Sequence, residues 1–272
     1  MRMRAGIMRI GRIAVIAVAA YLAFRWLEPQ GRGWWVLVGA AIGTIIWIGI
    51  RAYRARKLRA EEERIDRFAN ALMTPSDRPA AIEELRAAIG SAKSAEERAQ
   101  LRLSLAELLE ADGDAAGALE ALAPIERGSI GKRTTVIVAH ARAVAHLSRG
   151  DADAAADALD DDAAPTGDRA TDLRVKMMRG LIAAERGRFE EALEIAEHAR
   201  DEAGSDADLK TEARIVRAMA LDVRGEREAA LRGMHAIGEE MLSVLAVLGL
   251  PRVRELAQSA LDERDESPEP TA

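Results

Sequence analysis

The stretch RGLIAAERGRFEEALEIAEHA, residues 179–199, decides the fold because its small residues stand at regular helical spacings. It contains one His and no Cys, Ser or Thr, so it offers little catalytic chemistry. Gly187 divides it into two helical segments, since glycine readily takes the left-handed backbone that ends a helix. Gly180 and Ala192 flank this turn without bulky side chains, so the two helices can approach closely. We therefore expect a helix–turn–helix unit here.

The same pattern recurs along the chain in steps of 37, 37, 37 and 38 residues. The alanines equivalent to Ala192 are Ala81, Ala118, Ala155 and Ala230. A residue that favours a turn stands five positions before each alanine: Ser76, Gly113, Gly150, Gly187 and Gly225. A small residue stands twelve positions before each alanine: Ala69, Ala106, Ala143, Gly180 and Ala218. We expect Asp77, Asp114 and Asp151 to cap the helices that follow the turns. Such units bury their apolar faces only by stacking, which indicates an α-solenoid.

The segments RGDADAAADAL (149–159) and RGRFEEALEIA (186–196) resemble the tetratricopeptide repeat (TPR) family, whose units carry a Gly-Asp-type turn followed by this alanine. The resemblance implies an all-α protein with a right-handed, TPR-like solenoid of about five helix-turn-helix units over residues 61–240. The units are longer than the family's roughly 34 residues. They also lack the family's closing proline and its early large aromatic, for which Ile65, Arg102, Ala139, Lys176 and Arg214 stand instead.

The resemblance also implies a groove that holds a partner peptide. The family's groove positions fall on Leu103, Glu107, His140, Val144, Met177, Leu181, Ile215 and Met219. Most of them are apolar, which is typical of a surface that takes a helix or peptide. In the alternative interpretation the solenoid is tightly wound, and these residues only pack between units.

The N-terminal fifth of the chain has the composition of a membrane hairpin. Residues 34–50 carry no charge and residues 13–27 are almost uncharged, so each approaches the roughly 17–25 residues of a spanning helix. The loop 28–33 contains Pro29 and two glycines that break helical structure. A cleaved signal peptide is the alternative for the first span. Gly39 and Gly43 allow close helix packing, either within the hairpin or in a dimer.

The distribution of basic residues predicts the orientation of this hairpin. Arginines and a lysine crowd the basic N-terminus, residues 1–12, and the juxtamembrane segment, residues 51–60. The positive-inside rule then places both termini and the solenoid in the cytoplasm, at what the composition suggests is a bacterial inner membrane. The opposite alternative is a solenoid that faces the periplasm.

After the solenoid, residues 241–263 read as C-terminal capping helices. The segment 241–250, MLSVLAVLGL, is strongly apolar but too short to cross a membrane. We expect it to cover the open face of the last repeat, with a charged helix beginning at Pro251. Residues 264–272 form an acidic tail that we expect to be disordered.

The sequence offers few signs of catalysis. It has no Walker A, GxSxG or HExxH motif and no cysteine, and its four histidines are not grouped for a metal. The formal net charge of −6 does not suggest a nucleic-acid partner. We therefore expect no catalytic residue, cofactor, metal or small-molecule substrate. The predicted function is a scaffold or assembly factor that docks a membrane-associated protein at the lipid bilayer. The alternative is a membrane-tethered sensor or regulator of an envelope enzyme.

Overall fold

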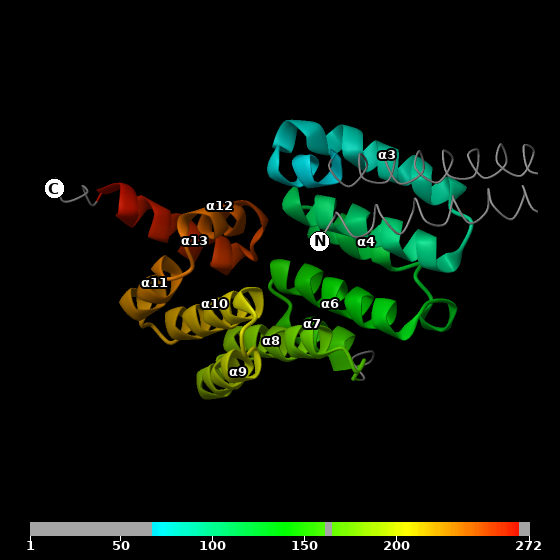
Figure 1. The fold of residues 1–272 in the computed structure, drawn as a ribbon. Helices are drawn as coiled ribbons and strands as arrows, with labels where there is room; N and C mark the ends of the chain where they lie inside the picture. The colour runs from blue at the N-terminus through cyan, green and yellow to red at the C-terminus, as the bar shows by residue number, and fades with distance from the viewer. Residues whose placement is uncertain (1–66, 161–164, 267–272) are drawn as a thin grey trace, which may run out of the picture. The chain divides into compact units, whose positions relative to one another are not determined.

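The computed structural model describes residues 67–160 and 165–266, and these residues form an all-helical array (Figure 1). A helix over 67–73 and a 3₁₀ turn, η2 (Pro75–Asp77), precede α3 (Arg78–Ser91). The elements that follow are α4 (Ala95–Ala111), α5 (Ala115–Leu122), η3 (Arg127–Ser129), α6 (Lys132–Ser148), α7 (Ala152–Asp160), α8 (Arg169–Glu185), α9 (Phe189–Glu202), α10 (Ala207–Val223), α11 (Arg227–His235), α12 (Glu239–Leu248) and α13 (Pro251–Glu266).

The predicted membrane spans 13–27 and 34–50, including Gly39 and Gly43, lie outside the described residues. Across the ranges 67–160 and 165–266, no helix combines the length and the apolar character that a membrane crossing requires. Of the predicted tail 264–272, helix α13 includes the first three residues, and the rest lie outside the description.

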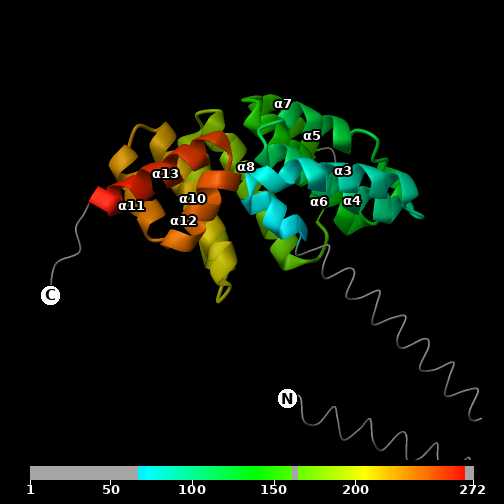
Figure 2. The ribbon, with the colours of Figure 1, turned by 90° about the horizontal axis from the view of Figure 1, so that it is seen from above.

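The helices pair and stack as the repeat pattern predicts. Helices α4 and α5, α6 and α7, α8 and α9, and α10 and α11 form four hairpins, which we call repeats 2 to 5. The second helix of each hairpin packs against the first helix of the next one, and the first helices also contact one another along the array (Figure 2). Repeat 1 comprises the helix over 67–73 and α3, which packs against α4. The predicted helical solenoid is thus confirmed.

The glycine turns of repeats 2 to 5 share one backbone geometry. Gly113, for example, has φ +83°, and its N–H donates to the carbonyl of Glu110 at 2.9 Å. The next N–H, of Asp114, donates to the carbonyl of Leu109 at 2.8 Å, which completes a Schellman motif. The same pair of bonds recurs at Gly150, Gly187 and Gly225. These four turns confirm the pattern.

Two of the three predicted aspartate caps are present. The carboxylates of Asp114 and Asp151 accept hydrogen bonds from Gly117 N at 2.8 Å and Ala154 N at 3.0 Å. Asp77 makes no such bond, so that prediction is wrong. Here the chain forms η2 in place of a glycine turn, and Pro79 occupies the first turn of α3, which removes one N–H that a cap would bind.

The predicted small residues fill the helix–helix contacts in repeats 2 to 5. Ala106 and Ala118, like their equivalents in the other three repeats, are buried. At Gly180 the helices leave no room for a larger side chain, because an added Cβ would lie 2.8 Å from Cγ1 of Val216. Repeat 1 departs from this register, because Ala69 is exposed and Ala71 is buried in its place.

The C-terminal helices cap the array as predicted, but α13 provides more of the cap than the apolar helix α12 does. Helix α13 contacts α11 and α10, and it buries Val253, Leu256, Ala257 and Ala260. Helix α12 contributes Leu242 to the same cluster, as expected of a cap. Its far end, however, reaches α4 in repeat 2, so α12 does not simply cover the last repeat. A tight turn at Gly249 and Pro251 then leads back into α13.

Candidate protein-binding groove

The first helices of repeats 2 to 5 share one surface, which we call the inner face. On this face a cavity of about 280 Å³ lies between α4 and α6. Most of its lining is apolar and includes Leu72 from repeat 1, Ile137 from α6 and Leu248 from α12. The side chain of Ile137 is 39% exposed, which is unusual for a large aliphatic residue in this structure. The cavity is therefore an accessible apolar site.

Four of the eight predicted groove residues line this cavity. The structure brings Leu103 and Glu107 of α4 together with His140 and Val144 of α6. Leu103 is 8% exposed and belongs to the core that supports the cavity floor, whereas Glu107 remains exposed. Helical spacing explains this agreement, because residues three or four positions apart lie on one face of a helix.

The other four predicted residues are not accessible in the same way. Met177 and Met219 are 2% and 1% exposed and belong to the core between repeats. Leu181 and Ile215 are half-buried and pack against a cluster that Leu245 and Leu250 also cover. Over repeats 4 and 5 the groove prediction is therefore corrected, since the chain's own C-terminal segment covers this part of the inner face.

Desolvation in and around the cavity disfavours the charged forms of its titratable side chains. Desolvation, aided by the charge of Arg174, lowers the pKa of His140 to about 4, so the imidazole is neutral at pH 7. Desolvation raises the pKa of Glu107, although its side chain keeps access to solvent. Desolvation also raises the pKa of Glu110, against which a hydrogen bond from Ser148 at 2.7 Å acts. A nearby cation favours the ionised form of a carboxyl group in such surroundings.

The first turn of α13 supplies cations to this face. Nε of Arg252 lies 3.4 Å from the carboxylate of Glu185, at the end of α8. Its Nη1 lies 3.6 Å from Asp222, at the end of α10. Desolvation raises the pKa of Glu110, at the end of α4, and the charge of Arg254 partly opposes this rise. Acidic groups at helix C-termini are unfavourable by themselves, and these arginines offset that cost.

Comparison with known protein families supports the repeat assignment. A tetratricopeptide repeat model matches residues 136–161, 173–198 and 211–232. The matches fall on α6 with α7, α8 with α9, and α10 with α11. Three segments of the chain are therefore similar to TPR repeats. Searches of curated proteins and of solved structures returned no match.

TPR repeats suggest a role in protein–protein interaction. In repeat 2, which lies outside the matched segments, the turn geometry and the buried alanines are those of the matched TPR repeats. The inner-face cavity thus lies between repeat 2 and the first matched repeat. Within the part of the chain that the structure describes, no three acidic or histidine side chains gather closely enough to hold a metal ion.

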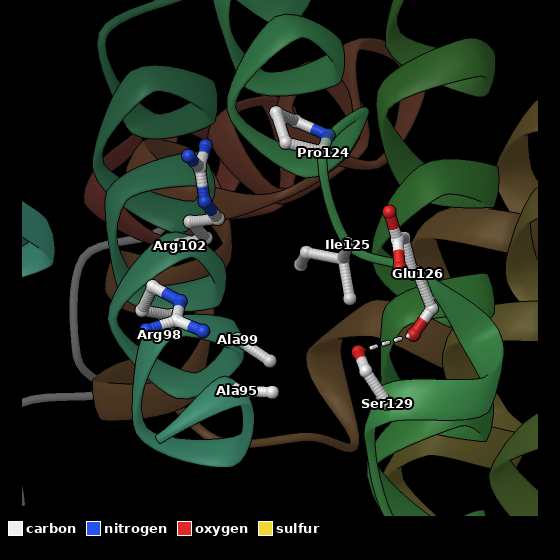
Figure 3. Close-up of a pocket in the computed structure, with 8 residues that line it drawn as sticks. All are labelled: Ala95, Arg98, Ala99, Arg102, Pro124, Ile125, Glu126 and Ser129. Atoms are coloured by element: carbon white, nitrogen blue, oxygen red, sulfur yellow. Dashed lines mark hydrogen bonds between the residues drawn. The ribbon is translucent and has the colours of Figure 1, made fainter. Parts of the chain in front are cut away.

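A second cavity, of about 220 Å³, lies between α4 and the connection from α5 to α6 (Figure 3). The sequence pattern did not indicate it. Arg98 and Arg102 lie one helical turn apart on one wall, opposite Ile125. Both guanidinium groups already donate to backbone carbonyls, that of Arg98 to Ala92 at 3.1 Å and that of Arg102 to Ala121 at 3.0 Å. These hydrogen bonds therefore hold repeat 2 together.

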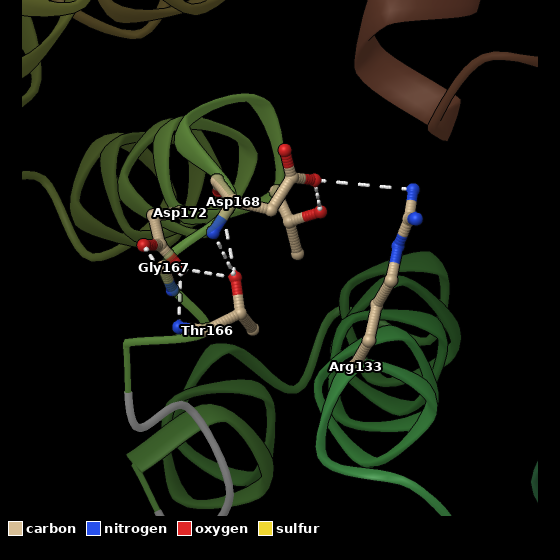
Figure 4. Close-up of polar contacts among 6 residues, drawn as sticks. Arg133, Thr166, Gly167, Asp168 and Asp172 are labelled. Carbon is tan, nitrogen blue, oxygen red and sulfur yellow. Dashed lines mark hydrogen bonds and ion pairs between the residues drawn. The ribbon is translucent and has the colours of Figure 1, made fainter.

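A polar network orders the entry to α8 (Figure 4). The carboxylate of Asp172 accepts from N and Oγ1 of Thr166 at 2.7 and 2.8 Å, and these bonds lower the pKa of Asp172. Arg133 of α6 lies 3.8 Å from Asp168, which connects this entry to the preceding TPR repeat. Each polar group has a structural partner, so the network positions α8 and offers no free nucleophile.

Proposed function

We propose that this chain is a non-enzymatic interaction protein that docks a partner protein in the cavity between α4 and α6. The cavity carries the proposal, because it is an accessible, mostly apolar hollow on the face that the TPR repeats share. Apolar surfaces of this kind take up helices or extended peptides. The neutral His140 and the carboxyl group of Glu107 offer no positive charge to an acidic guest at this site.

Site-specific photo-crosslinking in the native cell tests this proposal. A photo-reactive amino acid replaces Ile137, whose side chain lies in the cavity and is accessible. The matched control replaces Glu197, an exposed residue on α9. We expect a discrete cross-linked protein from position 137 and none from position 197. Equal cross-linking from both positions, or none from position 137, would contradict docking in the cavity.

We further propose that residues 13–27 and 34–50 anchor the chain in a bacterial inner membrane, with Gly39 and Gly43 at the contact between the two spans. Their uncharged length and the basic residues on both sides support this proposal. The TPR array and both termini then face the cytoplasm, and the partner is a membrane-associated protein. Protease treatment of spheroplasts tests the orientation: a C-terminal tag should survive unless the membrane is permeabilised. Digestion of the tag in intact spheroplasts would contradict it.

A further inference from the structure

The docking cavity carries an acidic side chain to which the chain itself gives no partner. Glu107 of α4 lines the cavity and is exposed. Among residues 67–160 and 165–266, no group donates a hydrogen bond to its carboxylate or forms an ion pair with it. Desolvation by the surrounding protein raises the pKa of Glu107, and no opposing charge acts against this rise. The cavity therefore presents a carboxylate that lacks a cation.

The other acidic groups near the inner face differ from Glu107 in this respect. Glu185 and Asp222 lie 3.4 and 3.6 Å from one guanidinium group at the start of α13. Desolvation raises the pKa of Glu110, the next acidic residue along α4, but the charge of Arg254 partly opposes this rise. Of these four carboxyl groups, only that of Glu107 receives no cation from the described part of the chain.

The rest of the cavity lining supplies no cation either. Besides Glu107 and Glu110, the polar residue in the lining is His140. Desolvation lowers the pKa of His140 to about 4, so its imidazole is neutral at pH 7. A neutral imidazole still has one nitrogen that accepts a hydrogen bond. A guest that brings hydrogen-bond donors therefore meets acceptors in this lining and no competing positive charge.

A guest that covers the cavity also changes the surroundings of this carboxylate. A wholly apolar guest would remove Glu107 from water without giving it a partner, which is unfavourable. An ammonium or guanidinium group would instead pair with the carboxylate. Lys and Arg have aliphatic stems that pack on apolar surfaces while their charged ends reach polar groups. The apolar lining from Leu103, Ile137 and Val144 suits such a stem.

We propose that the cavity receives a lysine or arginine side chain, carried on an apolar segment of a partner protein, and that Glu107 pairs with its charged group. Apolar neighbours of this side chain then cover Ile137. This inference rests on the proposed docking function and adds which side chain the cavity selects. Glu107 thereby determines specificity, because it favours a basic guest over an acidic or a purely apolar one.

The first test needs no natural partner. Ligand-observed NMR measures the binding of three probes with the same alkyl chain, n-pentylammonium, 1-pentanol and pentanoate, to the full chain. We expect n-pentylammonium to bind at least about tenfold more tightly than 1-pentanol, and pentanoate to bind least. Glu107→Gln keeps the size of the side chain but removes its charge, so this preference should disappear. Glu120→Gln, at an exposed site on α5, is the matched control and should retain the preference.

The second test uses photo-crosslinking from position 137 in cells. The yield of the adduct is compared between the wild-type background, Glu107→Gln, Glu107→Leu and the control Glu120→Gln. We expect at least about fivefold less adduct in both Glu107 variants and an unchanged yield in the control. Glu107→Leu makes the lining more apolar, so a purely apolar guest would instead cross-link more strongly in this variant. Unchanged thermal unfolding of the variants would show that the helical array remains folded.

Three results would overturn the proposal. The first is equal binding of n-pentylammonium and 1-pentanol to the wild-type chain, or a preference that persists in Glu107→Gln. The second is an adduct whose yield stays the same or rises in Glu107→Leu. The third is an adduct with twice the mass of the chain, which would assign the cavity to a second copy. Failure of the docking proposal is distinct from these, because it would appear as no discrete adduct from position 137 in the wild-type background. The probes would then still establish whether the cavity selects a cation.

Discussion

The guanidinium of Arg252 lies 3.4 Å from the carboxylate of Glu185, and this contact joins the start of α13 to the end of α8. It fixes the turn after α12 against the inner face of the fourth repeat. The inner face is consequently covered over repeats 4 and 5 and open between repeats 2 and 3. A partner can therefore reach the inner face at the cavity beside Ile137.

The close contact at Gly180 predicts a strong effect of a single methyl group. In Gly180→Ala the new Cβ would lie 2.8 Å from Cγ1 of Val216 and 3.1 Å from Cγ2 of Ile195. Overpacking of this kind costs about 1–3 kcal/mol of unfolding free energy, which urea unfolding measures. Gly233→Ala is the control, since its Cβ meets Ala218 at an ordinary 3.6 Å. Equal stability of the two variants would show that the helices approach less closely than described.

The buried arginine of repeat 1 should be indispensable for that repeat. Arg78 is 4% exposed and donates to the carbonyl oxygens of Ala71, Leu72 and Ala111. Arg78→Met leaves these carbonyls without their charged donor, at a cost of about 2–4 kcal/mol. Hydrogen exchange should show that residues 67–91 lose protection first. An exposed control, Arg86→Met, should lower the stability by under about 0.5 kcal/mol. Full protection of repeat 1 in Arg78→Met would contradict this account.

The neutral state of His140 predicts a pH dependence of stability. Its pKa is about 4 in the folded chain and 6.5 in the reference state, so the unfolded chain binds the proton first as the pH falls. His140 therefore reduces stability progressively from pH 6.5 to pH 4, by at most about 3 kcal/mol. His140→Gln should flatten the slope of the unfolding free energy in this range. If the slope is the same in His140→Gln and wild type, the imidazole is not desolvated.

The repeats could be predicted from the sequence because they depend on local, periodic signals. Gly113 and its equivalents end helices through their own backbone, and the buried alanines recur at a fixed offset from these turns. The groove positions that the TPR resemblance implies include Leu103, Glu107, His140 and Val144, which line one cavity. Each of these features involves residues within one repeat or its direct neighbour.

Features that depend on distant contacts were not predictable in this way. The register that brings Val144 to the cavity also selects Met177 and Met219, but both methionines are buried. Met177 lies in the core between repeats 4 and 5, and Met219 lies in a cluster that Leu245 and Leu250 of the C-terminal segment cover. No local pattern indicates that Leu248 reaches α4, or that Arg78 satisfies the carbonyl of Ala111. These contacts arise only once the array has formed and its ends meet other elements.

The most direct test of the central claim is photo-crosslinking in cells from position 137 in the cavity, compared with the exposed position 197 on α9. The account predicts one discrete cross-linked protein from position 137 and none from position 197. No adduct from position 137, or equal adducts from both positions, would contradict docking of a partner in the cavity.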